Sequence, residues 1–249
     1  MNFTVFNDET LEDLQINGLY ILQKKDSFRF GMDAVLLSGF VSVKNGARVL
    51  DLGTGTGIIP LLLSAKTPAE YIAGIEIQPE IADMAMRSVR GNGLEDKIEI
   101  IQGDLKKARE ILKPASFDAV VTNPPYMRTG SGLINPEQGK AIARHEISCT
   151  LQDVLTSAAT MLKPNGDFFM VNRPDRLADA IEGMRKVKIE PKLLRFVSPR
   201  YSSAPNLFLV KGLKNGNPGL KILPNLVIYN EDGQYTDEVK LMYNIKAEL

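Results

Sequence analysis

Short apolar segments alternate with helix-like segments through the middle of the chain, and this alternation constrains the fold more than any other feature. Four segments have the length and composition of buried β-strands: 48–52, 71–77, 98–101 and 117–122. Apolar residues at helical spacing follow two of them, at 58–65 and from Pro79 onward, where a proline suits a first helical turn. Such alternation predicts an α/β fold, a mainly parallel sheet with helices on both faces.

The later part of the chain continues this pattern and then departs from it. Thr150 to Asp153 resembles a capping box that opens another helix, and 163–166 turns the chain into a fifth strand at 167–171. After about residue 190 we find no convincing helix. Three strand-like segments there predict an antiparallel edge on the same sheet: 192–197, 206–211 and 226–229.

The first 45 residues read as an extension. We expect a small hairpin of 19–23 with 27–30, followed by a helix over 33–40. The predicted organisation is one globular unit, in which residues 1–45 pack on a core domain of residues 46–249.

Composition excludes several classes of protein. Lys and Arg total 30, as do Asp and Glu, so overall charge does not indicate a nucleic-acid binder. Cys149 and His145 are each alone, which excludes an intrachain disulfide and predicts no metal site. The acidic first residues do not resemble a signal peptide, and apolar runs fall short of the roughly 20 residues that span a bilayer. We therefore expect a cytoplasmic protein with no membrane contact.

A glycine loop follows the first predicted core strand directly. Asp51 precedes glycines at every second position, Gly53, Gly55 and Gly57, where the next helix begins. Glycines let the backbone approach a ligand closely at the carboxyl end of a strand. Ile58 stands where a dinucleotide fingerprint has its third glycine, and Asp51 suits an amine better than a phosphate. The alternative is a tight turn without a ligand.

Acids stand at the ends of the next two predicted strands. Glu76 can accept hydrogen bonds from both hydroxyls of a ribose. Asp104 can accept from an adenine amino group, or it can be the N-cap of a helix around Lys106. Together with the glycine loop, these strand ends predict a pocket for a nucleoside that carries a charged tail.

The most specific motif is Asn123-Pro124-Pro125-Tyr126, directly after the fourth core strand. Two prolines remove two N–H donors, so carbonyl oxygens dominate the main chain there. The Asn123 side-chain oxygen and the Pro124 carbonyl can both accept from one NH₂ group, and Tyr126 offers a face on which a planar group stacks. The pattern indicates a site for a planar exocyclic amine. The alternative is a proline-rich turn that only ends the strand.

These motifs resemble the class I S-adenosylmethionine methyltransferases, and among them the amino-methyltransferases with an Asn-Pro-Pro-Tyr motif. The resemblance implies a Rossmann-like seven-stranded sheet, mostly parallel with an antiparallel edge. It implies S-adenosyl-L-methionine as cofactor. The methionine part of the cofactor would lie by Asp51, Gly53, Gly55 and Gly57. Its ribose would lie by Glu76, and its adenine by Asp104. It also gives Asn123, Pro124 and Tyr126 the role of holding the target nitrogen for in-line methyl transfer.

Segments outside the core resemble the bacterial tRNA(Val) adenine-N6 methyltransferase family. They are 28–37, Ala143 to Glu146 and Tyr235 to Glu238, so the resemblance spans nearly the whole chain, although only the core motifs are specific. It implies adenine-N6 methylation during tRNA processing. Phe30, Gly31 and Asp33 would border the cofactor pocket, and the loop from Met127 to Arg144 would fold near the substrate. His145, just beyond that loop, favours an orienting or surface role over that of a base.

Other functions fit parts of the same pattern. A glutamine amide also presents a planar NH₂, so a release-factor type glutamine-N5 protein methyltransferase is the closest rival, with other RNA-base N-methyltransferases also open. Against the first, only about 45 residues precede the core, without the helical domain usual in those enzymes. A nucleotide-binding oxidoreductase and a non-catalytic nucleotide-binding protein fit the motifs less well.

The segment from Arg185 to Lys221 holds nine basic residues and one acid, Glu190. Such an excess predicts either a solvated surface or a local positive field that binds RNA phosphates. The competing cluster near the N-terminus is Lys24, Lys25 and Arg29. Under the second interpretation the tRNA-contact surface includes Arg185, Lys186, Arg195 and Arg200.

Overall fold

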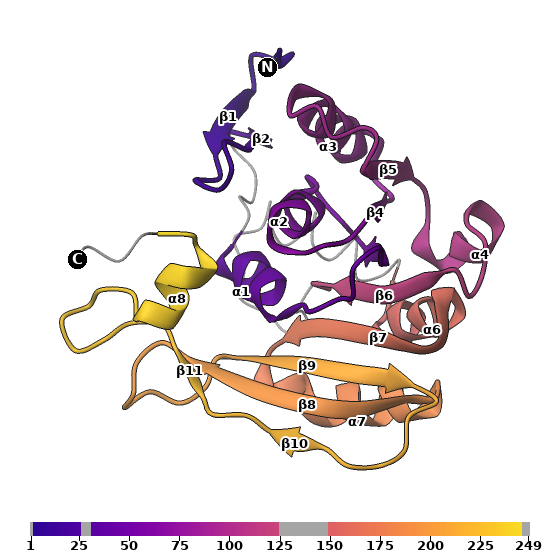
Figure 1. Cartoon of the computed structure of the whole chain (residues 1–249), viewed down its shortest axis with the longest axis vertical. Coiled ribbons are helices and arrows are strands. Elements are labelled where there is room, and N and C mark those ends of the chain that lie inside the picture. The colour runs from indigo at the N-terminus through magenta and orange to yellow at the C-terminus, as the bar shows by residue number, and fades with distance from the viewer. Residues whose placement is uncertain (1, 26–30, 125–148, 246–249) are drawn as a thin grey trace, which may run out of the picture.

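The computed structural model of the chain describes residues 2–25, 31–124 and 149–245. Its main strands are β3 (Arg48–Leu52), β4 (Tyr71–Glu76), β5 (Ile98–Gln102), β6 (Phe117–Thr122), β7 (Leu162–Asn172), β8 (Ile189–Ser198) and β9 (Leu207–Lys214). They lie in the order β8-β9-β7-β6-β3-β4-β5, and β3 to β7 all pair in parallel (Figure 1). The predicted α/β sheet is confirmed.

Helices cover both faces of this sheet. They are α1 (Met32–Phe40), α2 (Ile58–Lys66), α3 (Pro79–Gly91), α4 (Ala108–Ile111), α6 (Leu151–Met161), α7 (Leu177–Lys186) and α8 (Asp237–Met242), with 3-10 turns η1 (Leu105–Lys107) and η2 (Pro174–Arg176). Strand side chains alternate between two apolar cores. In β7, Phe169 and Val171 join the core of α1, α2 and α3, whereas Phe168 and Met170 join the core of α4, α6 and α7.

The predicted antiparallel edge is present on this sheet. β8 and β9 form it, and β9 pairs antiparallel with both β7 and β8. Two short strands, β10 (Lys221–Ile222) and β11 (Leu226–Val227), pair in parallel with β8. The reason is that the chain reverses both before and after β9, so the segment predicted at 226–229 returns in the direction of β8.

Helix α8 contradicts the expectation that no helix follows residue 190. Its six residues are too few to show helical periodicity in the sequence. Thr236 is its N-cap residue and donates from Oγ1 to the Val227 carbonyl at 2.7 Å. Glu238 accepts two hydrogen bonds from the Arg195 guanidinium, at 2.5 and 2.7 Å. These contacts place α8 beside α1, although the two helices lie near opposite ends of the chain (Figure 1).

The N-terminal hairpin of the described residues consists of β1 (Glu9–Asp13) and β2 (Tyr20–Lys24). The predicted pairing of 19–23 with 27–30 stays a prediction. Residues 27–30 lie outside the described residues. Gln15, Asn17 and Gly18 adopt positive φ angles of 56°, 50° and 67°, which turn the chain tightly enough to bring β1 back along β2.

Hydrogen bonds attach this hairpin to α3. The Leu22 amide donates to Ser88 Oγ at 2.9 Å, and the Tyr20 amide donates to Asn92 Oδ1 at 2.9 Å. The helix that was predicted over 33–40 is present as α1.

The second half of the sheet contains two local features that the sequence indicated, a capping box and a turn. The capping box predicted at Thr150 and Asp153 is present at the start of α6. The turn expected at 163–166 is a bulge inside β7: Phe117 pairs with Leu162 and Ala119 pairs with Asp167. In the described ranges no helix is both long and apolar enough to cross a membrane.

Candidate active site

Four of the predicted site residues come to one edge of the sheet. Asp51 lies in β3 just before its end, Glu76 ends β4, Asp104 follows β5 and Asn123 follows β6. The four strands are neighbours in the order β6-β3-β4-β5 and run in parallel. Their carboxyl ends therefore form one continuous edge, the position where open α/β sheets bind ligands.

The glycine loop keeps a shape that other residues would strain. Gly53, Gly55 and Gly57 have φ angles of 75°, 57° and 83°, in the left-handed region. The amides of Gly53 and Thr54 both donate to the Ile75 carbonyl of β4, at 3.0 and 2.9 Å. The loop is thus attached to the neighbouring strand before it enters α2.

Gly74 supports this loop, and the sequence analysis did not single it out. A Cβ atom added at Gly74 would lie 2.8 Å from Oγ1 of the buried Thr54. Only glycine therefore lets Thr54 pack against β4. The available signal was a glycine inside a buried apolar strand, which often marks a close approach of another chain segment.

The Glu76 carboxylate holds the loop from the other side. Its Oε2 accepts from the Gly55 amide at 3.0 Å, and its Oε1 accepts from the amide of Gln78 at 2.9 Å. Gln78, another residue that was not singled out, also donates from Nε2 to Oε1 at 3.3 Å. A carboxylate offers about four acceptor positions, so Glu76 keeps capacity for ligand hydroxyls.

Asp51 is the least satisfied polar group at this edge. Its side chain is fully buried, and among the described residues neither carboxylate oxygen has a hydrogen-bond partner; Oγ1 of Thr54 also lacks one there. Burial raises the pKa of Asp51 to about 7; the neighbouring Thr54 side chain opposes this rise, and the nearby charge of Glu76 adds to it. Cβ atoms added at Gly53 and Gly55 would meet no atom within 4 Å, so the space beside them is open. A buried carboxylate without a described partner, on the strand that leads into the glycine loop, fits a ligand with hydrogen-bond donors.

Asp104 takes the alternative role that its sequence allowed. Its Oδ1 accepts from the Lys106 amide at 2.9 Å as the N-cap of η1. The contact to an adenine amino group stays a prediction, since a capping carboxylate still has free acceptor positions.

Asn123 is positioned through its neighbour Thr122. The buried hydroxyl of Thr122 donates to the Leu52 carbonyl at 3.0 Å, which joins the end of β6 to the end of β3. Asn123 therefore lies directly beside the glycine loop. It is half-buried, and Pro124 after it is buried. The other predicted residues of this motif and its loop lie outside the described residues: Pro125, Tyr126, Met127 to Arg144 and His145, as does Phe30.

Asp33 lies in the first turn of α1, which packs beside α2. Its place at the cofactor pocket stays a prediction.

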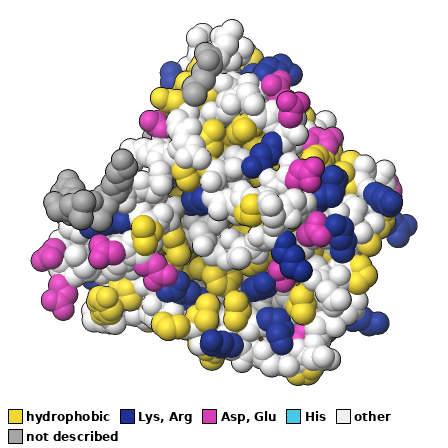
Figure 2. Space-filling model, viewed as in Figure 1, with side chains coloured by type: hydrophobic (Ala, Val, Ile, Leu, Met, Phe, Trp, Pro, Cys, Tyr) yellow, Lys and Arg dark blue, Asp and Glu magenta, His cyan; other side chains and the backbone are white. Residues whose placement is uncertain are grey.

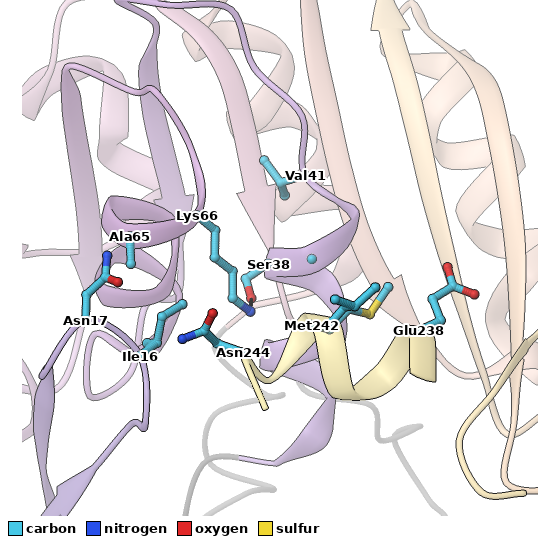
Figure 3. Close-up of a pocket in the computed structure, with 11 residues that line it drawn as sticks. Ile16, Asn17, Ser38, Val41, Ala65, Lys66, Glu238, Met242 and Asn244 are labelled. Carbon is cyan, nitrogen blue, oxygen red and sulfur yellow. Dashed lines mark hydrogen bonds between the residues drawn. The ribbon is translucent and has the colours of Figure 1, made fainter. Parts of the chain in front are cut away.

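A cavity of about 430 Å³ lies at the opposite edge of the sheet (Figure 3). It lies among the hairpin turn, the last turns of α1 and α2, and α8. Lys66 points into it and donates from Nζ to Ser38 Oγ at 2.8 Å, while burial lowers the pKa of Lys66 to about 8. Because α2 begins at Ile58, directly after the glycine loop, and runs for about 13 Å, this cavity is separate from the carboxyl edge.

Acids neutralise most of the predicted basic surface. Arg185 pairs with Glu190 at 3.1 Å and Lys186 pairs with Glu182 at 2.6 Å. Arg195 pairs with Glu238 of α8. Lys and Arg likewise lie beside Asp and Glu over much of the face in Figure 2. Sequence spacing could not show which acids fold against these bases.

A family model for the methyltransferase small domain matches residues 30–188. The chain belongs to this methyltransferase family. A tRNA1(Val) (adenine(37)-N6)-methyltransferase of Bacteroides thetaiotaomicron is 33% identical over 169 residues, which are 68% of this chain and 69% of that protein. Another protein of that name, from Aeromonas hydrophila, is 28% identical and covers 85% of this chain and 86% of its own length.

A crystal structure described as a predicted O-methyltransferase, from Agrobacterium tumefaciens, has the same fold. Its TM-score is 0.69 at 21% identity, and the match covers 87% of this chain and 98% of that one. The family match, the relatives and the fold agree that the chain is an S-adenosylmethionine-dependent methyltransferase. The expectation from the class I resemblance is confirmed.

Proposed function

We propose that this enzyme transfers the methyl group of S-adenosylmethionine to the N6 amine of an adenine in tRNA. The observation that carries the proposal is the position of Asn123 and Pro124, at the carboxyl end of β6 and beside the glycine loop. Relatives named as tRNA adenine-N6 methyltransferases support adenine over the rival glutamine amide. Since its substrate is tRNA, we place the enzyme in the cytoplasm.

The cofactor would lie along the edge from β3 to β5. Asp51 and the glycine loop would hold its amino acid part, and Glu76 its ribose. Asp104 would lie by its adenine, with Phe30 and Asp33 at the border of the pocket. When bound, the cofactor supplies an electrophilic methyl group on a sulfonium. The unpartnered oxygens of Asp51 support this assignment, since a cationic amine there would satisfy them.

The protein's part in the reaction is mostly positioning and electrostatics. The Asn123 side-chain oxygen and the Pro124 carbonyl accept the two hydrogens of the target amine, and Tyr126 stacks on the base. Held in this way, the neutral nitrogen directs its lone pair toward the methyl group, and its proton then passes to solvent or a nearby acceptor. No strong general base is required. A base in structured RNA must leave its stack to reach Asn123.

We also propose that residues 1–45 are part of the same folding unit as residues 46–249. The hydrogen bonds between β2 and α3 support this, as does the buried ion pair between Glu9 and Arg87, whose atoms lie 2.6 Å apart. The hairpin is then a structural extension of the methyltransferase core.

The test is incubation with labelled cofactor and unmodified tRNA, followed by nucleoside analysis of the product. We expect label in N6-methyladenosine. A release factor incubated in parallel is the comparison substrate. Label in its glutamine, and none in tRNA, would assign the enzyme to the rival class.

A further inference from the structure

The connection between β8 and β9, residues 199–206, lies at the same edge as Asn123. Thr122 pairs with Met170, Met170 with Val210, and Val210 with Leu194, so these four residues form one row across the sheet. The row spans three strand spacings, about 14 Å from β6 to β8. β8 points in the direction of β6 and continues to Ser198, so its following connection projects past this row on the side of Asn123.

Backbone hydrogen bonds fix the shape of this connection. The Ser203 amide donates to the Arg200 carbonyl at 3.1 Å, and the Asn206 amide donates to the Val197 carbonyl at 3.0 Å. The Tyr229 amide donates to the Pro199 carbonyl at 2.9 Å. A surface loop held at both ends and from a neighbouring segment presents its side chains with little entropy to lose on binding.

Two side chains of this loop suit an RNA strand. Tyr201 keeps 74% of its surface exposed, and Arg200 before it is exposed too. Within the described part of the chain, no carboxylate forms an ion pair with Arg200. Its guanidinium lies near Gly233, where an added Cβ atom would be 4.0 Å from Nη2 of Arg200. An exposed guanidinium binds phosphate, and an exposed aromatic ring stacks on an unpaired base.

The other predicted basic residues contrast with this pair. Arg185 and Lys186 end α7 just before β8 begins, so they lie at the opposite edge from Asn123, and each pairs with a glutamate. Arg195 is occupied by Glu238. Of the four residues named from the sequence, Arg200 alone combines the catalytic edge, exposure and a guanidinium without an ion pair in the described structure.

We propose that Arg200 and Tyr201 form an RNA-contact surface that holds the tRNA beside Asn123. Arg200 binds a backbone phosphate, and Tyr201 stacks on a base next to the target adenosine. This inference rests on the proposed tRNA methylation and gives the substrate a defined side of approach.

The experiment compares Arg200→Ala and Tyr201→Ala with the control pair Arg185→Ala and Lys186→Ala. Filter binding of unmodified tRNA is measured across a salt series, and cofactor affinity and melting temperature are measured on each variant. We expect Tyr201→Ala to weaken tRNA binding by about 5- to 150-fold, while Tyr201→Phe keeps most of it. Arg200→Ala should weaken binding and lower the slope of log affinity against log salt by about 1, because one phosphate contact is lost.

Tyr201→Ala should leave that slope unchanged, and neither variant should change cofactor affinity. If both variants bind tRNA as the control pair does, while the wild type still methylates tRNA, the contact surface is wrong and the proposed function stands. If the wild type neither binds nor methylates tRNA, the RNA-contact surface and the proposed function are both wrong. Preferential loss of binding to a protein substrate in the same variants would also overturn the RNA surface.

Discussion

Two aspartates at opposite edges of the sheet differ in their hydrogen-bond partners. At the carboxyl edge, Asp51 is buried, and neither of its oxygens has a partner among the described residues. At the opposite edge, Asp118 accepts from the Arg48 amide at 2.9 Å and from Lys163 Nζ at 2.7 Å. Burial alone would raise the pKa of Asp118, but these two hydrogen bonds lower it. Asp118 therefore contributes to stability, whereas Asp51 stays available for a ligand.

The largest expected effect is on catalysis at the carboxyl edge. Asn123→Ala should lower turnover by about 10³-fold, because the target amine loses an acceptor that orients it in the transition state. Cofactor affinity should stay within a few-fold of the wild type, since Asn123 contacts the amine and not the cofactor. Single-turnover kinetics beside calorimetry with the cofactor measure both. Asn217→Ala, at an exposed residue between β9 and β10, is the matched control. Near wild-type turnover in Asn123→Ala would remove this residue from the site.

The second prediction concerns the cost of burying Asp51. Its pKa is raised in the folded protein, so from about pH 4 to pH 7 the folded state holds a proton that the unfolded state has lost. Stability without cofactor therefore falls as pH rises through this range. Since each pKa unit corresponds to about 1.4 kcal/mol, the full penalty above pH 7 is at most about 4 kcal/mol.

Asp51→Asn removes this charge, and it should raise the melting temperature at pH 8 and change it little at pH 4. Its affinity for the cofactor should fall, because the carboxylate is what a cationic amine requires. Calorimetric melting at the two pH values, without cofactor, measures the first effect. If the variant is no more stable than the wild type at pH 8, burial of the Asp51 charge does not destabilise the protein.

Glu76→Gln should have a smaller effect. A neutral amide is a poorer acceptor for ribose hydroxyls than a carboxylate, so cofactor affinity should fall by about 10- to 100-fold. The Gly55 amide also loses a charged partner. Titration calorimetry tests this, with Glu99→Gln on the exposed side of β5 as control. Unchanged affinity would move the ribose contact to another residue.

The smallest expected effect is on stability, and it has the opposite sign to the effect of Asp51→Asn. Asp118→Asn should destabilise the protein by about 1–2 kcal/mol at pH 7, because it weakens two hydrogen bonds to a charged acceptor. The pKa of Asp118 is lowered, so its stabilisation is present above the unfolded pKa near 4 and is lost on acidification. Denaturant unfolding at pH 7 and at pH 3 measures the loss, and cofactor affinity should not change. If Asp118→Asn stabilised the protein at pH 7, Asp118 would not differ from Asp51 in its effect on stability.

Much of the site could be predicted because its signals are local. Glycines with positive φ, a proline pair and an acid at a strand end each depend on a few neighbouring residues. Gly74 and Gln78 were missed, since a supporting residue is recognised only by the segment that packs against it. β1 was also missed, and the tight turn at 15–18 brings it back along β2.

The sequence by itself determined the alternation of strands and helices, the glycine loop and the motif at Asn123, and with them the methyltransferase family. Tertiary structure alone decided which charges are satisfied. Arg195 pairs with Glu238 across 43 residues of chain, while Arg200, five residues after Arg195 and just past the end of β8, stays exposed. Hydrogen-bonding and steric preferences act between neighbours in the chain and leave a local pattern. Electrostatic energies depend on burial and on distances in space, which exist only after folding.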